Sequence, residues 1–261
     1  MTKHEKHRVL LAEQEHPIQT STTRSKKRLQ AEVVEYREIN ENLLILTLRP
    51  TQALSFQPGE YVKLEIAGIK RRYSLVSAPH EEVLEFYIER VPEGKMTSLL
   101  WTLQRGDRVT VQTKTKGKLW LDLRFPAQLM VATVTGIGPF ISMIRAYLYE
   151  GRQGHTFYIL HGTSYYDEFA HQAELEDLVA QHPNLITYVP MISRPTEARN
   201  ARWTGETGRV SNLVAKYIRQ FALDPRSAQL YACGHPEMVK EVKKRFGHEG
   251  FRVQTERYWK T

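Results

Sequence analysis

The chain has 261 residues, of which 41% are hydrophobic and 25% are charged, and its formal net charge is +8. The length allows two domains, and the composition is typical of a globular protein. It contains no run of about 18 apolar residues, and its N-terminal segment lacks the apolar core of a secretory signal, so we expect neither a membrane span nor export. The single cysteine excludes an internal disulfide and favours a reducing, cytoplasmic location.

Residues 1–28 are polar and basic. They hold seven Lys and Arg residues against three acidic ones, so half of the net positive charge lies in this segment. We interpret it as a flexible, solubilising extension. The alternative is attraction to an acidic partner or to nucleic acid. No basic patch with interleaved aromatics and no helix-turn-helix pattern supports a nucleic-acid partner.

Residues 29–125 carry six short segments that are rich in β-branched and aromatic residues and often alternate. Turn signals such as Gln57-Pro58-Gly59 separate them. Strands are expected over 30–37, 43–49, 61–66, 71–76, 84–90 and 108–113, and one helix over 97–103. Short strands joined by turns predict an antiparallel β-barrel.

Residues 126–261 have a different rhythm, in which continuous apolar runs alternate with segments of helical period. Strands are expected over 128–133, 156–161, 185–189, 229–232 and 253–258, and helices over 140–150, 168–181, 210–221 and 236–246. This alternation predicts an α/β domain with a parallel sheet and crossover helices. Ligands of such sheets bind at the carboxyl ends of the strands.

Two segments of the predicted barrel offer the groups that a flavin dinucleotide needs. Tyr73 presents an aromatic face for the ring, Ser74 a hydroxyl for its reactive nitrogen, and Arg71 a planar cation for the pyrophosphate. Residues 94–97 begin the predicted helix, whose backbone N–H groups attract phosphate. Each segment alone is equally consistent with an exposed strand or an ordinary turn. Their combination, in a barrel followed by an α/β domain, favours FAD.

Residues that suit a nicotinamide dinucleotide follow the apolar strands of the second domain. Gly136 and Gly138 come after the first strand and allow a pyrophosphate to approach the backbone. We expect Cys233, at the end of a later strand, to lie beside the nicotinamide ring without acting as a nucleophile; an inert buried cysteine is the alternative. Arg194 and Arg209 are two cations that would select a 2′-phosphate, hence NADPH, unless they are ordinary surface arginines.

The assembled motifs resemble the ferredoxin–NADP⁺ reductase family, most closely its bacterial members, over residues 29–259. The matching segments are Arg71-Arg72-Tyr73-Ser74, Gly94-Lys95-Met96-Thr97 with the preceding strand 85–90, Cys233-Gly234-His235-Pro236-Glu237-Met238-Val239, and the closing Thr255-Glu256-Arg257-Tyr258-Trp259. The resemblance implies an enzyme with FAD and NADP(H) and without a metal. It implies hydride transfer between the two cofactors and single-electron transfer to an acidic ferredoxin or flavodoxin.

The motifs and the resemblance together assign the site residues. Those expected at FAD are Arg71, Arg72, Tyr73, Ser74, Tyr87, Ile88, Glu89, Arg90, Lys95, Met96, Thr97, Thr135, Tyr258 and Trp259. Those expected at NADP(H) are Thr163, Ser164, Ser193, Arg194, Arg209 and Cys233. The predicted catalytic residues are Ser74, Cys233, Glu256 and Tyr258. By resemblance, Tyr258 covers the second flavin face as a lid, Trp259 packs against the adenine, and Glu256 lies near the nicotinamide.

Three features depart from the family pattern. Val134 stands between two threonines where glycine is usual, and because valine disfavours positive φ we expect the loop to differ in shape. Ser164 occupies the place of an expected arginine, which predicts a weaker preference for NADPH. The segment 195–206 is longer than expected for its loop.

Other functions remain open at this stage. Within the enzyme class the alternatives are an NAD(P)H-dependent reductase of free flavin and the reductase component of an oxygenase. The aromatic C-terminus argues against free flavin, because it would hold the dinucleotide tightly. From another class, a flavin-containing regulatory or binding module without turnover is favoured by Val134 and Ser164. We expect a monomer with neither nucleic acid nor a membrane as partner.

Overall fold

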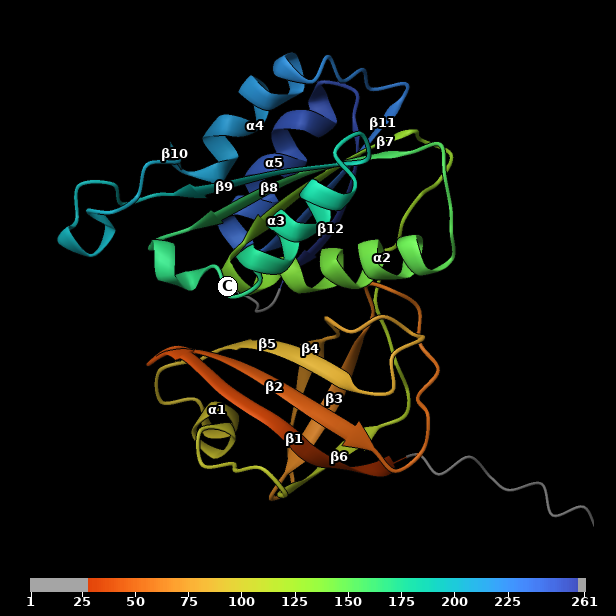
Figure 1. Cartoon of the computed structure of the whole chain (residues 1–261), viewed down its shortest axis with the longest axis vertical. Coiled ribbons are helices and arrows are strands. Elements are labelled where there is room, and N and C mark those ends of the chain that lie inside the picture. Colours follow the sequence, from red (N-terminus) through yellow and green to blue (C-terminus); the bar gives the residue numbers. More distant parts are fainter. Residues whose placement is uncertain (1–27, 258–261) are drawn as a thin grey trace, which may run out of the picture.

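The computed structural model describes residues 28–257. Two lobes are stacked along the long axis of the molecule, with an antiparallel sheet below and a parallel sheet above in Figure 1. This arrangement confirms the predicted fold class, a β-barrel followed by an α/β lobe. Residues 1–27, which make up nearly all of the predicted basic extension, lie outside the described residues, as do Tyr258 and Trp259.

The first lobe is a nearly closed barrel with the strand order β4-β3-β6-β1-β2-β5. Its elements are β1 (Arg28–Asn40), β2 (Leu43–Pro50), β3 (Tyr61–Ile66), β4 (Ile69–Ser74), β5 (Leu84–Glu89), α1 (Lys95–Leu100) and β6 (Arg108–Gln112). Alternate residues fill the interior: Phe86 on β5 and Leu46 on β2 are paired and fully buried. The outermost strands meet just beyond β4, where the N–H of Val76 donates to the carbonyl of Glu85 at 2.9 Å.

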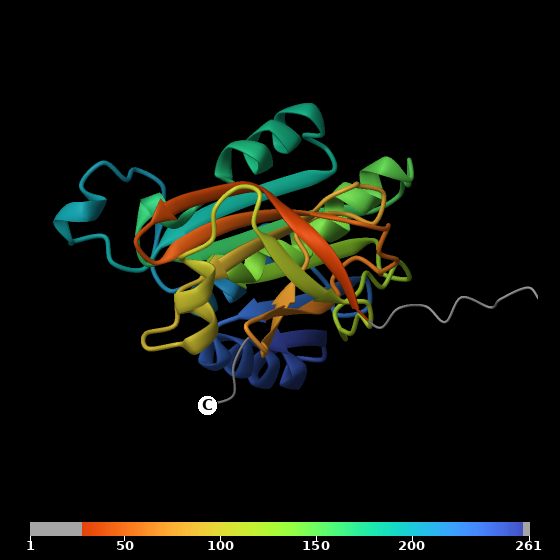
Figure 2. The same cartoon turned by 90° about the horizontal axis from the view of Figure 1, so that it is seen from below.

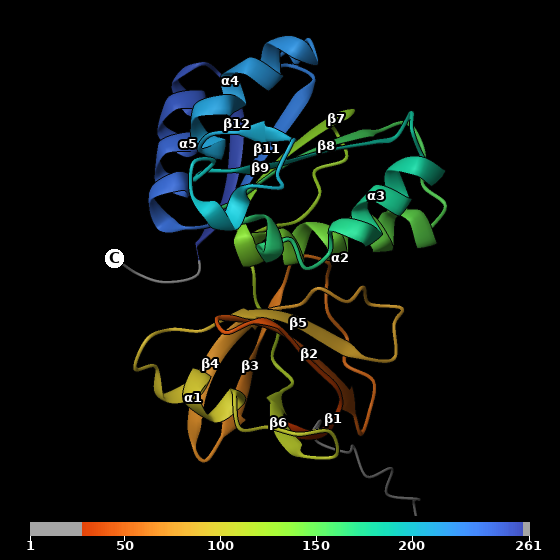
Figure 3. The ribbon, with the colours of Figure 1, turned by 60° about the vertical axis from the view of Figure 1, so that its left-hand side comes forward.

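The second lobe is a parallel sheet with the strand order β10-β9-β8-β7-β11-β12. Its strands are β7 (Ala127–Thr133), β8 (Thr156–Thr163), β9 (Ile186–Ile192), β10 (Glu206–Thr207), β11 (Ala228–Gly234) and β12 (Arg252–Arg257). Its α-helices are α2 (Gly138–Tyr149), α3 (Gln172–Gln181), α4 (Val210–Gln220) and α5 (Pro236–His248). Helices α2 and α3 cover the face nearer the barrel, and α4 and α5 cover the other face (Figure 3). Within residues 28–257 no helix is long and apolar enough to cross a membrane.

Some boundaries differ from the sequence-based expectation. Helix α1 begins at Lys95 and ends at Leu100, earlier than expected at both ends. Helix α3 begins only at Gln172, because residues 166–168 form a separate 3₁₀ turn that ends at Glu168. The carboxylate of Glu168 accepts the N–H groups of Ser164 and Tyr165 at 2.9 and 3.1 Å. Strand β10 was not predicted, since two residues at the end of a long loop carry no recognisable period.

The two lobes share a buried interface. Leu43 and Tyr87 of the barrel belong to the same apolar cluster as Phe140 of α2. Arg145, also on α2, binds Glu85 of the barrel at 2.8 Å. Seen from the barrel end, β1 and β2 cross in front of the α/β lobe (Figure 2). The carboxyl edge of the parallel sheet and the outer face of β5 are therefore held next to each other.

Candidate flavin and nucleotide site

A cavity of about 340 Å³ opens between β4, β5 and the start of α1. It is lined by Arg71, Arg72, Tyr73, Ser74, Tyr87, Ile88, Glu89, Val91, Gly94, Lys95, Met96, Thr97 and Thr135. The structure thus brings together every described residue that was expected at FAD except Arg90. The guanidinium of Arg90 lies 5.5 Å from the centre of the Trp101 ring instead.

The β4 side of this cavity is set by antiparallel pairing with β3, in which Val62 opposes Tyr73. The Tyr73 ring meets Phe86 edge to face, with ring centres 6.5 Å apart. Burial raises the pKa of Tyr73, so its hydroxyl stays protonated at neutral pH. The guanidinium of Arg71 donates to the carbonyl of Lys70 at 2.8 Å. A fixed aromatic ring, a cation and the Ser74 hydroxyl therefore line one wall.

The opposite wall is the turn into α1. The Thr97 hydroxyl lies 3.0 Å from the carbonyl of Gly94 and 3.1 Å from that of Val91, so it can donate to either. A Cβ at position 94 would meet the Thr97 hydroxyl at 2.6 Å and the Val91 carbonyl at 2.9 Å. Only glycine fits this close turn, and Gly94 and Lys95 both line the cavity.

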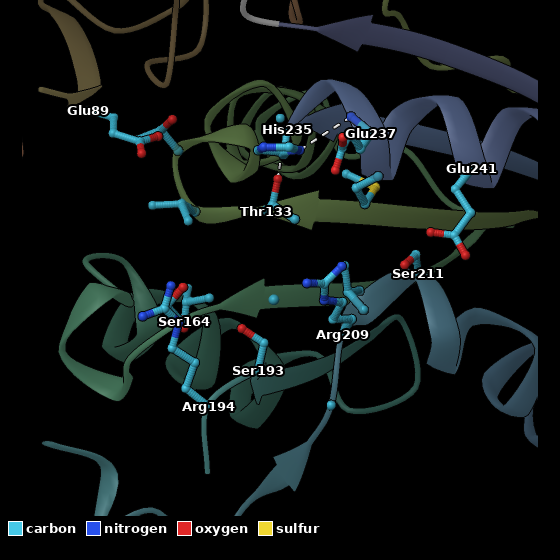
Figure 4. A pocket seen from close by; sticks show the side chains of 18 residues that line it. Glu89, Thr133, Ser164, Ser193, Arg194, Arg209, Ser211, His235, Glu237 and Glu241 are labelled. Carbon is cyan, nitrogen blue, oxygen red and sulfur yellow. Dashed lines mark hydrogen bonds between the residues drawn. The ribbon is translucent and has the colours of Figure 1, made fainter. Parts of the chain in front are cut away.

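A second cavity of about 430 Å³ lies at the carboxyl edge of the parallel sheet (Figure 4). It is lined by Glu89, Thr133, Val134, Thr135, Gly162, Thr163, Ser164, Ser193, Arg194, Gly208, Arg209, Val210, Ser211, Gly234, His235, Glu237, Met238 and Glu241. It collects Thr163, Ser164, Ser193, Arg194 and Arg209, all expected at NADP(H). Within residues 28–257, Glu89 and Thr135 are the residues that line both cavities.

The glycines after β7 have a different role from the one expected. Gly136 and Gly138 do not line the nucleotide-side cavity. A Cβ on Gly136 would run into the carbonyl of Cys233, and one on Gly138 would meet the Val76 side chain at 3.0 Å. They allow close packing between chain segments. Gly234, at φ +120°, lines the cavity instead.

The Cys233 side chain is fully buried and packs in the apolar cluster shared by the two lobes. It lines neither cavity. This buried position agrees with the alternative of an inert cysteine. A place for Cys233 beside the nicotinamide ring stays a prediction. Glu256 opposes it across the β11–β12 ladder.

Glu256 is a largely buried carboxyl group. Burial raises its pKa to about 7, although the N–H of Lys118 and the charge of Arg72 act in the other direction. Its Oε2 atom has no hydrogen-bond partner among the described residues. A carboxyl group in this state exchanges a proton near neutral pH.

Val134 adopts a φ of +43°, the left-handed conformation that its side chain disfavours. Its carbonyl accepts a hydrogen bond from Nε2 of His161 at 2.9 Å. The loop was expected to change shape to avoid this conformation. The structure instead keeps the positive φ and places the strained residue on the wall of the nucleotide-side cavity.

The two arginines of this cavity differ in their surroundings. Arg194 donates to the hydroxyl of Tyr165 at 2.9 Å and pairs with Glu197 at 3.3 Å. Arg209 stands at the N-cap of α4 and forms no salt bridge with any residue in 28–257. Its charge is therefore the less compensated of the two.

Sequence reasoning missed Asn200, which ties the long segment 195–206 to the cavity wall. Its buried amide donates to the carbonyls of Ser164 and Arg194 at 2.9 and 2.8 Å. Its Oδ1 accepts the N–H of Tyr166 at 3.0 Å. An asparagine in a polar loop carries no sequence signal for burial.

Comparisons with known proteins agree with this architecture. Two family models match the chain, an oxidoreductase FAD-binding domain over residues 30–119 and an oxidoreductase NAD-binding domain over residues 130–244. Together they cover most of the chain.

Individual relatives are distant but extend over both lobes. The flavodoxin/ferredoxin–NADP reductase of Buchnera aphidicola subsp. Baizongia pistaciae is 26% identical, over 88% of this chain and 98% of the relative. The electron transfer component of toluate 1,2-dioxygenase from Pseudomonas putida is also 26% identical, over 85% of this chain and 64% of that longer protein. A ferredoxin NADP⁺ reductase from Neisseria gonorrhoeae, solved with bound FAD and NADP, matches with a TM-score of 0.77 and 25% identity over 89% of this chain and 99% of that one.

The barrel, the parallel sheet and the two adjoining cavities define an oxidoreductase that binds FAD and a nicotinamide dinucleotide. The FAD-binding model matches the barrel, and the NAD-binding model matches the α/β lobe. The chain belongs to the ferredoxin–NADP⁺ reductase family, as its motifs predict.

Proposed function

We propose that the chain takes hydride from NADPH onto FAD and passes single electrons to a small acidic carrier protein, a ferredoxin or a flavodoxin. The observation that carries this proposal is the meeting of the two cavities at Glu89 and Thr135. A ring held in the barrel and a nucleotide held at the sheet edge could touch there without a wall between them.

The residues of the barrel cavity fit a flavin dinucleotide. Bound FAD would supply the chemistry, since it takes hydride from a reduced nicotinamide and releases electrons one at a time. Tyr73 would support one face of the ring, and Ser74 would hydrogen-bond near its reactive nitrogen. Arg71 and Lys95 would bind the pyrophosphate, and Gly94 lines the same part of the cavity beside Lys95.

The preference for NADPH rests on the polar and cationic residues of the other cavity. Ser193, Arg194 and Arg209 offer a hydroxyl and two guanidinium groups to a 2′-phosphate. Ser164 offers no positive charge. Because Glu197 already binds Arg194, Arg209 should contribute more of the discrimination against NADH.

The test is the visible spectrum of the purified holoprotein under anaerobic conditions. We expect a yellow protein whose flavin absorbance bleaches at lower concentrations of NADPH than of NADH. Reduction of an acidic ferredoxin should follow, and it should slow as salt is added, because opposite charges speed the encounter at low ionic strength. Material that stays colourless after reconstitution with FAD would contradict the proposal.

A second candidate is the reductase component of an oxygenase. It is favoured by the similarity to the toluate 1,2-dioxygenase component, of which this chain spans less than two thirds. A reduction rate that is high with an oxygenase partner, but low and independent of salt with acidic ferredoxin and flavodoxin, would favour it. A flavin that NADPH binds but does not bleach would favour a regulatory module without turnover.

The proposal places the enzyme in the cytoplasm as a monomer. The support for the location is the reduced state expected for the buried Cys233. Fractionation of cells and light scattering of the holoprotein would test these two points.

A further inference from the structure

Glu89 reaches from the flavin-binding barrel into the nucleotide-side cavity. It ends β5, and alternation along this strand fixes its direction. Leu84, Phe86 and Ile88 point into the barrel core. The residues between them face the α/β lobe, so Glu89 follows Glu85 and Tyr87 on that side. Figure 4 shows Glu89 at one end of the cavity, on the same side as Ser164.

The carboxylate of Glu89 has no compensating partner in the described chain. Tyr87, two residues earlier on the same face, donates to the carbonyl of Glu168 at 2.6 Å. Glu85, further back, binds Arg145 at 2.8 Å and His171 at 2.7 Å. Burial and the nearby charge of Glu168 raise the pKa of Glu89, and neither a cation nor a hydrogen-bond donor acts against them.

Among the residues that the structure describes, no hydrogen bond joins the carboxyl group of Glu168 to that of Glu89. The Oε2 atom of Glu168 accepts the N–H groups of Ser164 and Tyr165, which fixes its carboxylate in the turn before α3. Two carboxyl groups thus lie near each other, one satisfied and one open to the cavity. Glu89 is half-buried, and a carboxylate at a cavity wall without a donor or cation of its own favours a ligand that brings hydroxyl groups to it.

The position of Glu89 indicates which part of a dinucleotide would meet it. A nicotinamide that reaches the barrel cavity while its pyrophosphate stays at the sheet edge must pass the junction formed by Glu89 and Thr135. The unit between those two groups is the ribose attached to the nicotinamide, and its two hydroxyls are donors. The phosphates, which a carboxylate would repel, lie further into the α/β lobe in this pose.

We propose that Glu89 binds the hydroxyl groups of the nicotinamide-side ribose and so positions the nicotinamide at the mouth of the flavin cavity. This assignment rests on the proposed function, because it needs a nicotinamide dinucleotide in the cavity. It gives a residue of the flavin-binding lobe a direct part in nucleotide recognition.

The experiment compares two ligands on the FAD-loaded protein by equilibrium titration of the flavin difference spectrum, with calorimetry as a second measure. NADP⁺ carries the nicotinamide-side ribose, and 2′,5′-ADP carries only the adenosine half. We expect Glu89→Ala to weaken NADP⁺ about tenfold, the loss of one hydrogen bond to a charged group, and to leave 2′,5′-ADP unchanged. Glu89→Gln, which keeps one acceptor and the shape of the side chain, should lose less.

Glu32→Ala is the matched control, since it removes the same charge from an exposed site on β1 that lines neither cavity. It should leave both affinities unchanged. NADP⁺ affinity that is unchanged or higher in Glu89→Ala, or an equal loss for both ligands, would overturn the assignment while the proposed function stands. A parent protein that binds neither ligand would overturn the proposed function, and the role of Glu89 with it.

Discussion

Nε2 of His161 donates a hydrogen bond to the main-chain oxygen of Val134 at 2.9 Å, and this bond holds a β-branched residue at a φ of +43°. Nδ1 of the same ring lies 3.2 Å from the hydroxyl of Tyr188, which can donate to it only while the ring is neutral. The imidazole is almost wholly buried. It joins β8 to the strained loop on the wall of the nucleotide-side cavity.

The strain at position 134 can be measured with a pair of variants. Val134→Ala and Val134→Gly both remove the side-chain methyl groups, but only glycine adopts positive φ without a steric penalty. We expect the glycine variant to be more stable than the alanine variant by about 1 kcal/mol, the reverse of the usual order. Urea unfolding of both proteins gives the comparison. An alanine variant of equal or greater stability would show that the loop carries no such strain.

Burial lowers the pKa of His161 from 6.5 to about 4, although the bond to Val134 acts in the other direction. Between these values the unfolded chain binds a proton that the folded chain does not, so stability falls as the pH falls from 6.5 towards 4. The slope approaches about 1.4 kcal/mol per pH unit for this one group. As the pH falls from 6.5 to 4, the free energy of unfolding of the parent should therefore fall relative to that of His161→Gln. Parallel curves for the two proteins would mean that the ring is protonated in the fold.

Glu256 should change the pH dependence of stability in the direction opposite to that of His161. Burial raises its pKa from 4.5 to about 7, so the folded chain keeps a proton that the unfolded chain has released. Stability then falls as the pH rises from 4.5 to 7. Relative to the parent, Glu256→Gln should gain roughly 3 kcal/mol between pH 4.5 and pH 8. A constant difference between the two unfolding curves would contradict the raised pKa.

Arg145 should be the most costly charged residue to remove at the lobe interface. It binds Glu85 at 2.8 Å and Glu174 at 2.6 Å, and all three side chains are largely shielded from solvent. Arg145→Leu leaves Glu174 without its cation and Glu85 with His171 alone, so we expect a loss of about 3–5 kcal/mol in guanidinium unfolding. Arg152→Leu removes an exposed pair with Glu150 and should cost less than about 1 kcal/mol. Similar losses in the two variants would argue against a buried network.

Arg209 and Arg194 should contribute unequally to the choice of nucleotide. Arg209→Ala is expected to weaken NADP⁺ by about tenfold or more while leaving NAD⁺ unchanged, since a bond between two charged groups is lost. Arg194→Ala should lose less, because Glu197 already binds that guanidinium. Arg202→Ala, an exposed arginine that does not line the cavity, is the control. Equal losses of NADP⁺ and NAD⁺ affinity would show that Arg209 does not bind the 2′-phosphate.

Much of this arrangement could be predicted from local sequence. Alternation located the barrel strands, and the cation, aromatic and hydroxyl groups of Arg71, Tyr73 and Ser74 indicated a cavity because they are close together in the chain. The features that escaped prediction depend on segments far apart in sequence. Gly136 is required by the carbonyl of Cys233, almost a hundred residues later.

The same limit applies to the junction of the two cavities. Glu89 was expected among the flavin residues, and the flavin-side cavity does include it. Its exposure to the nucleotide-side cavity follows from how the lobes pack, which no strand pattern specifies. Asn200 escaped for a similar reason, because its partners Ser164 and Tyr166 belong to another loop.

The apolar cluster that runs from Leu43 and Tyr87 of the barrel into Phe140 of α2 has a thermodynamic consequence. Neither sheet can melt without exposing part of the other's buried surface to water, so heating should give one cooperative transition in place of two. Either lobe expressed alone would expose the apolar residues of this interface to water and would be prone to aggregate.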